Sequence, residues 1–209
     1  CKSYLKDVDF VRCAKDIFLR KGESLEGIED KVTSQLGYPV FVKPTDGGSS
    51  FGVTKVKRAE DLRAAIEFAF EDTATVMIEA GVSGREITCA VYQEGVSEVA
   101  LPVIEIVTDH EFFDYEAKYN GFSEEICPAP LDAAMTSKVQ ETSRKIYNQL
   151  GCKGLVRVDY ILCGEELYFL EMNTIPGMTA ASLVPKMVKT AGLSMTDFLN
   201  TVIDSTASL

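Results

Sequence analysis

Two neighbouring strand-like runs near the C-terminus carry the side chains with the clearest chemistry. The runs are separated by a short polar turn, Cys163-Gly164-Glu165-Glu166, and therefore predict a β-hairpin. On this hairpin Asp159 lies opposite Glu171, and Arg157 lies opposite Asn173. Two carboxylates and an amide supply the oxygen ligands that Mg²⁺ prefers, and Mg²⁺ usually takes further oxygens from water and phosphate. The pattern therefore predicts a Mg²⁺ site that takes part in phosphate chemistry.

Side-chain alternation separates this polar face from an apolar one. The expected apolar face consists of Val156, Val158, Tyr160, Leu162, Tyr168, Leu170 and Met172. An alternative without metal stays open, because opposed carboxylates repel and Arg157 could neutralise both in a structural salt-bridge cluster. A register shifted by one residue would also reverse the two faces.

A glycine-rich segment at residues 45–52 follows an apolar run that ends near Lys43, and a second β-type run, 53–56, comes after it. Glycine lets backbone N–H groups approach phosphate oxygens, while serine hydroxyls and the lysine add donors and charge. The segment is not a Walker loop, because it lacks the G-x-x-x-x-G-K-[ST] spacing and no helix follows. It predicts a hairpin that covers phosphates; a plain flexible hairpin is the alternative.

Ser182 begins a predicted helix that runs to about residue 191. Serine is a favourable N-cap residue, and Pro185 is tolerated in the first turn. The free N–H groups and the helix dipole at such an end favour an incoming anion. An ordinary capped helix is the alternative interpretation.

Five motifs occur in order along the chain. They are Lys43 with Gly48-Ser49-Ser50-x-Gly52, Ile78-Glu79-x-x-x-x-Gly84-x-Glu86, Tyr115-Glu116-Ala117-Lys118-Tyr119, Arg157-x-Asp159, and Glu171-x-Asn173-x-x-Pro176-Gly177-Met178-Thr179 with Ser182-Leu183-Val184-Pro185. Together they resemble the ATP-grasp part of the D-alanine-D-alanine ligase family. The last motif is the most specific, and the resemblance is weak before Lys43. One departure is Gly81, where many relatives have a bulky aromatic residue.

The resemblance implies a role in nucleotide binding for ten residues. Those proposed to contact the phosphates, adenine, ribose or nearby parts of ATP are Lys2, Lys43, Gly48, Ser49, Ser50, Glu79, Ala80, Val82, Glu86 and Lys118. The resemblance also implies that Asp159, Glu171 and Asn173 bind two Mg²⁺ ions, which Mn²⁺ could replace.

The remaining implied roles concern the amino-acid substrates. Arg157 and the N–H of Gly177 would stabilise the oxyanion of a tetrahedral intermediate. Ser182 and Leu183 would bind the carboxylate of the second amino acid. Ser49 and Tyr119 would join a hydrogen-bond network that fixes the loops over the substrates.

Members of this family join two D-alanines through an acyl phosphate for peptidoglycan precursor synthesis, so the resemblance implies a cytoplasmic carboxylate-amine ligase. Lys118-Tyr119 favours an amine acceptor over D-lactate. A D-alanine-D-serine ligase of the vancomycin-resistance type and another ATP-grasp carboxylate-amine ligase remain alternatives. A non-catalytic nucleotide-binding module would predict damaged metal ligands or loss of Arg157, and all of these residues are present.

The family also has an N-terminal domain, which binds the first D-alanine and supplies a glutamate to the Ser49 and Tyr119 network. Nothing in this sequence replaces that domain. We therefore expect an ATP-binding fragment that is inactive by itself, taken from a protein that forms a homodimer at full length.

The bulk composition excludes several classes of partner. A net charge of −11 and a pI near 4.6 disfavour nucleic acid and anionic membranes. No apolar run reaches membrane-spanning length, and no signal peptide is recognisable. The six cysteines form no C-x-x-C pair, which indicates reduced thiols in a cytosol.

The expected fold class is α+β: an ATP-grasp fold whose two lobes, 1–85 and 86–209, have antiparallel sheets that sandwich the nucleotide. The 209 residues can bury about 70% of their unfolded surface. Besides a short N-terminal helix, expected helices are 25–36, 59–70, 132–150, 182–191 and 194–205. Expected strands are 17–19, 38–44, 53–56, 75–79, 86–92, 96–107, 155–162 and 167–173. The irregular segment 108–131 is expected to be a binding loop.

Overall fold

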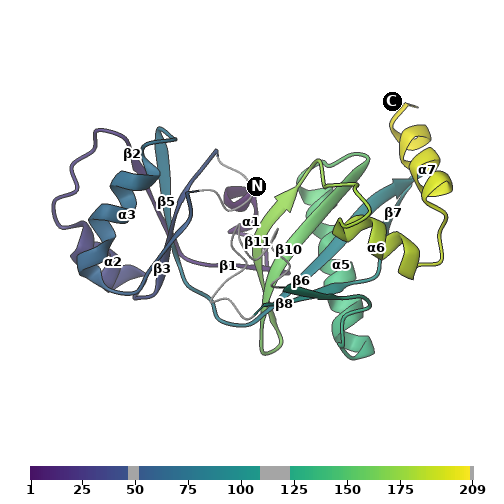
Figure 1. The fold of residues 1–209 in the computed structure, drawn as a ribbon, viewed down its shortest axis with the longest axis horizontal. Helices are drawn as coiled ribbons and strands as arrows, with labels where there is room; N and C mark the ends of the chain where they lie inside the picture. Colours follow the sequence, from purple (N-terminus) through teal and green to yellow (C-terminus); the bar gives the residue numbers. More distant parts are fainter. Residues whose placement is uncertain (47–51, 109–122, 208–209) are drawn as a thin grey trace. The chain divides into compact units, whose positions relative to one another are not determined.

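A computed structural model describes residues 1–46, 52–108 and 123–207, which form two compact units (Figure 1). The N-terminal unit is built on Ala14–Val82. The C-terminal unit combines Cys1–Cys13, Ser83–Val107 and the residues from Glu124 onward. The sequence grouped residues 1–13 with the first lobe, but they pack in the C-terminal unit because Leu5 and Val11 are buried in its core.

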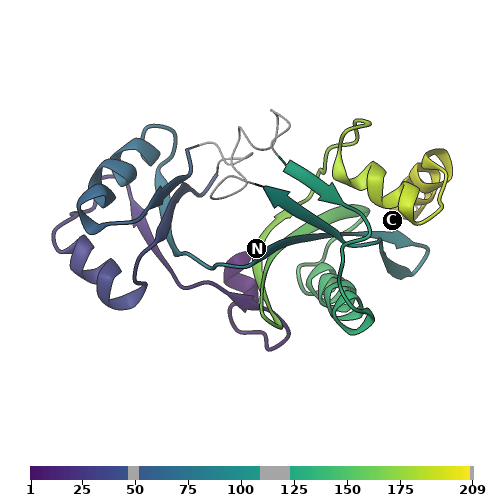
Figure 2. The ribbon, with the colours of Figure 1, turned by 60° about the horizontal axis from the view of Figure 1, so that its bottom comes forward.

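The N-terminal unit has an antiparallel sheet of four described strands with helices on one face (Figure 2). In sheet order the strands are β2 (Asp16–Arg20), β5 (Thr75–Ala80), β3 (Val40–Pro44) and β4 (Thr54–Val56). The helices are α2 (Ile28–Gln35), the 3₁₀ turn η1 (Ala59–Asp61) and α3 (Leu62–Ala69). In α3, Leu62, Ala65, Ile66 and Ala69 recur at helical spacing, and this apolar stripe is buried against the sheet.

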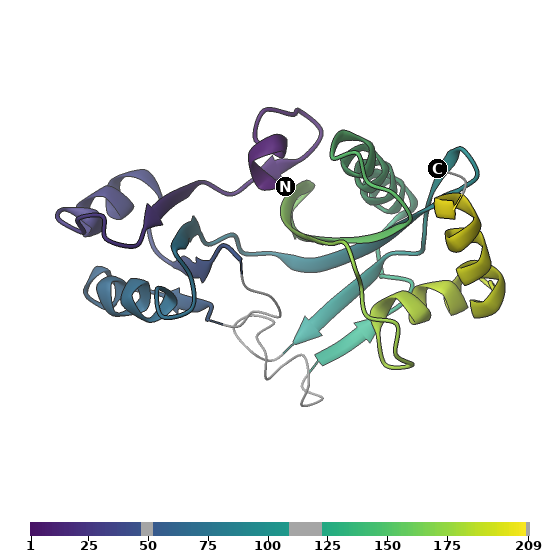
Figure 3. The same cartoon turned by 90° about the horizontal axis from the view of Figure 1, so that it is seen from above.

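The C-terminal unit has a sheet of seven described strands. The strands are β1 (Arg12–Cys13), β11 (Glu166–Asn173), β10 (Leu155–Cys163), β6 (Arg85–Glu94), β8 (Ile104–Thr108) and β9 (Ser123–Ile126) in sheet order, with β7 (Ser97–Ala100) also paired to β6. The helices are α1 (Lys2–Leu5), α5 (Ala133–Gln149), α6 (Leu183–Thr190) and α7 (Met195–Ala207). Figure 3 shows α5 on one face of the sheet, with α6 and α7 on the other.

The α5 helix starts where the sequence predicts. The Asp132 side chain accepts a hydrogen bond of 2.7 Å from the backbone N–H of Met135, which caps the helix. Val139, Ile146 and Tyr147 from α5 are buried in the core of the C-terminal unit. The apolar side chains of the β10–β11 hairpin reach this same core, so α5 fixes which face of the hairpin is buried.

The register of the β10–β11 hairpin is confirmed at its open end and wrong near its turn. Asp159 pairs with Glu171, and Arg157 pairs with Asn173, as expected. Beyond Asp159 the register shifts by one residue, and Leu170 becomes the extra residue of a β-bulge. A bulge reverses the alternation on its strand. Leu167 and Phe169 therefore enter the core instead of Tyr168 and Leu170, which are only partly buried.

Four other expectations need correction. The strand expected over 96–107 is divided into β7 and β8, because Pro102 lacks an N–H group for the sheet ladder. The helix expected from residue 25 begins after Gly27, which adopts a left-handed conformation. Strand β9 occurs within the segment that was expected to be irregular. The pairing of β1 with β11 is parallel, so the sheet is not wholly antiparallel.

The structure bears on two expectations from composition. All six cysteines are free, as expected, and burial raises the pKa of the Cys89 thiol to about 12, so this thiol stays protonated at neutral pH. Within the described ranges, no helix has both the length and the apolar character needed to cross a membrane.

Gly84 lets the start of β6 lie directly against β10. A Cβ atom at this position would come within 2.3 Å of the carbonyl oxygen of Leu162. We expect Gly84→Ala to lower the free energy of unfolding by about 1–3 kcal/mol, because backbone atoms must move to admit the methyl group. Urea unfolding measures the change, with the exposed Ser83→Ala as the control. Equal midpoints for the two variants would contradict this account.

Candidate functional site

The carboxylate of Asp159 is the centre of a hydrogen-bond cluster in the C-terminal unit. Asp159 is only 4% exposed. Its Oδ1 accepts from Thr88 Oγ1 at 2.5 Å and from Arg157 Nε at 2.8 Å. Its Oδ2 accepts from Arg157 Nη2 at 2.8 Å and from Asn173 Nδ2 at 3.0 Å. Four donors from three neighbouring strands therefore stabilise one buried negative charge.

Arg157 is the counterion of this carboxylate. Its side chain is 17% exposed and forms a two-pronged pair with Asp159. Burial lowers the pKa of the Arg157 guanidinium, but the hydrogen bonds with Asp159 and the negative charges of Asp159, Glu171 and Glu86 raise the pKa above its usual value overall. Arg157 therefore stays charged. Of the alternative structural cluster, in which Arg157 would neutralise both carboxylates, the structure contains the direct pair with Asp159. Glu171 and Glu86 contribute through their charges.

Glu171 and Asn173 complete the predicted set of metal ligands on β11. Glu171 is exposed, and it pairs directly with Asp159 across the hairpin. Asn173 is half-buried and turns its amide nitrogen toward Asp159. Among the described residues no group of three His, Cys, Asp or Glu side chains is placed to hold a metal ion. Two carboxylates with one amide nevertheless suit Mg²⁺, provided that Asn173 turns its oxygen inward and solvent or phosphate supplies the other ligands.

Lys43 and Glu79 form a second charged pair, in the N-terminal unit. Lys43 Nζ lies 2.5 Å from Glu79 Oε2, and the two side chains are 18% and 5% exposed. Their neighbours Val42 and Ile78 point into the core beneath α2 and α3, so the pair lies on the opposite face of the sheet. This face thus presents an ammonium donor beside a carboxylate acceptor.

The segment after Glu79 is held close to the strand ends of the same unit. The N–H of Ala80 donates to the carbonyl of Lys15, and the N–H of Gly81 donates to that of Pro39, both at 2.9 Å. A Cβ on Gly81 would be 2.8 Å from the Pro39 oxygen. The close approach explains why this chain has glycine here. Val82 follows as a half-buried residue.

The start of α6 agrees with the sequence in position but differs in detail. Ser182 is the N-cap, yet its side chain makes no capping bond to the helix. Instead, Ser182 Oγ accepts from the N–H of Thr179 at 3.1 Å. A Cβ on Gly177 would be 2.9 Å from Ser182 Oγ, so these two residues lie close together. Gly177 is exposed, Ser182 is half-buried and Leu183 is buried. The N–H groups at this helix end have no side-chain cap from Ser182 and can face an anion.

The remaining predicted residues either lie on other elements or fall outside the described residues. Glu86 is a half-buried residue on β6, and Lys2 is a half-buried residue on α1. Five predicted residues lie outside the described ranges: Gly48, Ser49, Ser50, Lys118 and Tyr119.

Thr88 is a buried member of the Asp159 cluster that the sequence did not predict. It lies on β6, pairs with Asp159 on β10, and is completely buried. A weak signal was present, because Thr88 is two residues beyond Glu86 and so shares its face of the strand. The contact with Asp159 depends on the pairing of β6 with β10, which the local sequence does not reveal.

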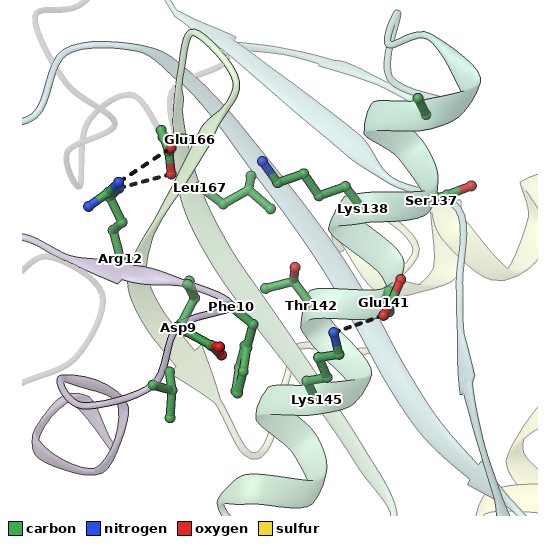
Figure 4. Close-up of a pocket in the computed structure, with 13 residues that line it drawn as sticks. Asp9, Phe10, Arg12, Ser137, Lys138, Glu141, Thr142, Lys145, Glu166 and Leu167 are labelled. Carbon is green, nitrogen blue, oxygen red and sulfur yellow. Dashed lines mark hydrogen bonds and ion pairs between the residues drawn. The ribbon is translucent and has the colours of Figure 1, made fainter.

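A cavity of about 590 Å³ lies elsewhere in the C-terminal unit, and no predicted site residue lines it (Figure 4). Residues 8–12, one face of α5 and the start of β11 surround it. Arg12 pairs with Glu166 and Lys145 pairs with Glu141 at its rim. These charges offset each other, so the cavity offers no strong preference for a charged ligand.

Comparisons with known proteins identify the family of this chain. A family model described as D-ala D-ala ligase C-terminus matches residues 5–204. A D-alanine--D-alanine ligase from Phocaeicola vulgatus is 48% identical over 98% of this chain, and one from Flavobacterium johnsoniae is 41% identical over 93%. The chain spans 63% and 59% of the lengths of these relatives.

Solved structures give the same result. The VanG D-Ala:D-Ser ligase from Enterococcus faecalis is 37% identical with a TM-score of 0.81, over 93% of this chain and 57% of its own. The D-alanine--D-alanine ligase from Bacillus anthracis complexed with ATP is 32% identical with a TM-score of 0.78, over 95% and 61%. The expected ATP-grasp fold of class α+β is therefore confirmed. Within that fold class, the chain belongs to the D-alanine-D-alanine ligase family and represents its C-terminal, ATP-grasp part.

The pairing of Arg157 with Asp159 predicts a large effect on stability. Arg157→Met should lower the free energy of unfolding by about 3–5 kcal/mol, because a buried carboxylate loses its counterion. Arg157→Lys should recover only part of the loss, since an ammonium cannot form the two-pronged pair. Urea unfolding at neutral pH measures both.

Arg12 provides the matched control for this prediction. It forms a similar pair with Glu166, but the side chains are 59% and 53% exposed. Water already solvates these charges, so Arg12→Met should change the free energy of unfolding far less. If the two methionine variants were equally destabilised, burial would not be the reason for the strength of the Arg157 pair.

Proposed function

We propose that the protein containing this chain is an ATP-dependent ligase that joins two D-alanines through an acyl phosphate, for peptidoglycan precursor synthesis. One observation carries the proposal: on the β10–β11 hairpin of this family member, Asp159 pairs with Glu171 and Arg157 pairs with Asn173. A carboxylate is a poor electrophile, and phosphorylation turns one of its oxygens into a leaving group that an amine can displace.

Asp159, Glu171 and Asn173 are the proposed ligands for two Mg²⁺ ions, with Mn²⁺ as a possible substitute. Bound Mg²⁺ would neutralise charge on the transferring phosphoryl group. Arg157 lies beside Asp159 and keeps its positive charge, so it can turn N–H donors toward the developing oxyanion. The N–H of Gly177 is the second proposed donor to this oxyanion.

Lys43 and Glu79 are proposed to bind ATP. The edge of adenine presents an acceptor, N7, beside a donor, the N6 amino group. A lysine donor next to a carboxylate acceptor has the complementary pattern, and Lys43 has further N–H groups for phosphate oxygens. The other proposed nucleotide contacts are Lys2, Gly48, Ser49, Ser50, Ala80, Val82, Glu86 and Lys118.

The acceptor amino acid is proposed to bind through its carboxylate at the start of α6. Support comes from Ser182, whose hydroxyl contacts the N–H and the hydroxyl of Thr179 instead of capping the helix. An anion would bind the N–H of Leu183, and the Ser182 hydroxyl would turn its proton from Thr179 toward this anion. Ser49 and Tyr119 are proposed to join a hydrogen-bond network that fixes the loops over the substrates.

D-Alanine is the favoured acceptor because relatives at 41–48% identity are named D-alanine--D-alanine ligase. D-Serine is the second candidate, since the E. faecalis D-Ala:D-Ser ligase is 37% identical. We further propose that the full-length protein has an N-terminal domain for the first D-alanine, forms a homodimer and acts in the cytoplasm.

Mg-ATP binding can be measured by thermal shift. We expect Mg-ATP to raise the unfolding temperature of the chain, because a ligand that binds only the folded state stabilises it. Asp159→Asn combined with Glu171→Gln should abolish this increase, since both carboxylate ligands are lost. The control combines Glu94→Gln with Glu141→Gln, two exposed carboxylates of the same unit. An undiminished shift in the Asp159 and Glu171 variant would contradict the proposed metal site.

ADP release by the full-length protein identifies the substrates. D-Alanine alone should stimulate ADP release and yield the D-alanyl-D-alanine dipeptide, whereas the Arg157→Lys variant should be much slower because its oxyanion contacts change. Addition of D-serine tests the second candidate through a mixed dipeptide. ADP release that required an unrelated carboxylic acid, and not D-alanine, would replace this proposal by another ATP-grasp ligation.

A further inference from the structure

Thr88 is buried beside the carboxylate of Asp159. Its side chain is completely inaccessible to solvent, and its backbone pairs with Asp159 between β6 and β10. The hydroxyl lies 2.5 Å from Asp159 Oδ1 and 3.3 Å from the carbonyl oxygen of Val158. A hydroxyl has one proton, and the short distance is typical of an O–H donor to a carboxylate. Thr88 therefore donates to Asp159.

The four donor atoms around Asp159 belong to three residues, and these residues are not equivalent. Arg157 and Asn173 are partly accessible, and each has a proposed task elsewhere, at the oxyanion and at the metal. Thr88 is held by strand pairing on both sides, because β6 lies between β10 and β8. Its hydroxyl cannot reach a substrate. If Arg157 and Asn173 turned toward their proposed partners, Thr88 would therefore still donate its hydrogen bond to Asp159.

The two oxygens of Asp159 also differ. Oδ1 accepts from Thr88, whereas Oδ2 accepts from Asn173, another of the three predicted ligands. A hydrogen bond that fixes Oδ1 limits rotation of the carboxylate about χ2 and leaves Oδ2 on the side of Asn173. Partners of this kind orient metal ligands, and their removal typically costs 10–100-fold in metal affinity.

We propose that Thr88 is a positioning residue for the metal site: its hydroxyl holds Oδ1 of Asp159 so that Oδ2 is presented to the cation. The inference rests on the proposed function of Asp159 as a metal ligand. Thr88 itself touches neither the metal nor the substrates.

The test measures binding of Mn²⁺ to the full-length protein by electron paramagnetic resonance, with a non-hydrolysable ATP analogue present. Thr88→Ala and Thr88→Ser both lose the methyl group and differ only in the hydroxyl. We expect the alanine variant to bind Mn²⁺ about 10–100-fold more weakly, and the serine variant to bind it nearly as well as the unchanged protein. Thr88→Val, which keeps the shape but lacks the hydroxyl, should resemble alanine.

Two controls separate this role from a general effect on folding. Thr142→Val changes a buried threonine on α5, outside the Asp159 cluster, and should leave Mn²⁺ affinity unchanged. Urea unfolding without metal reports the structural cost of each variant. If the alanine and serine variants bound Mn²⁺ equally, the inference would be overturned, even if both were destabilised.

Asp159→Asn distinguishes failure of this inference from failure of the proposed metal site. Loss of Mn²⁺ binding in Asp159→Asn, together with unchanged affinity in Thr88→Ala, overturns only the role of Thr88. Unchanged Mn²⁺ affinity in Asp159→Asn, or no Mn²⁺ binding by the unchanged protein, overturns both.

Discussion

A buried negative charge on Asp159 is the constraint on which the rest of the site depends. A carboxylate that is 4% exposed must find donors within the protein, and here they come from β6, β10 and β11. The cluster therefore fixes the pairing of three strands as well as one side chain. In the proposed metal site, these donors would make Asp159 a rigid ligand, because folding has already ordered the carboxylate.

Arg157 connects this structural role to chemistry. Its two-pronged pair neutralises Asp159, and burial does not remove its own charge. A cation that binds Asp159 would repel the guanidinium and weaken this pair. The guanidinium would then be available for a developing negative charge on the substrate. The same arginine can thus stabilise the fold and, in the proposed reaction, donate hydrogen bonds to the oxyanion of the substrate.

The hairpin shows how much of the site the sequence could reveal. The short turn before Glu166 predicted that Asp159 pairs with Glu171, because hairpin geometry is local. The bulge at Leu170 was not predicted, since Leu170 and its neighbour Phe169 are both apolar and either could face the core. Thr88 was not predicted because strand order between distant segments is set by packing of the whole unit. Strand β1 is too short to give a periodic signal.

The helices and strands of the N-terminal unit were more predictable, because their signals are local in the sequence. Its strands and α3 have regular apolar spacing, and Val42 and Ile78 mark the buried faces of the strands that carry Lys43 and Glu79. The pairing of these two strands was not predicted, because they are distant in the sequence. Gly81 stood out as a departure from relatives. Only the structure explains it, through the carbonyl of Pro39.

A crystal structure of the full-length protein with Mn²⁺ and an ATP analogue tests the central claim most directly. Anomalous scattering locates Mn²⁺ without reference to the protein. The account predicts a peak beside Asp159 Oδ2, with the Asn173 oxygen turned toward it and Thr88 still bonded to Oδ1. Bound nucleotide with no peak near Asp159, and Arg157 still paired to both carboxylate oxygens, would contradict it.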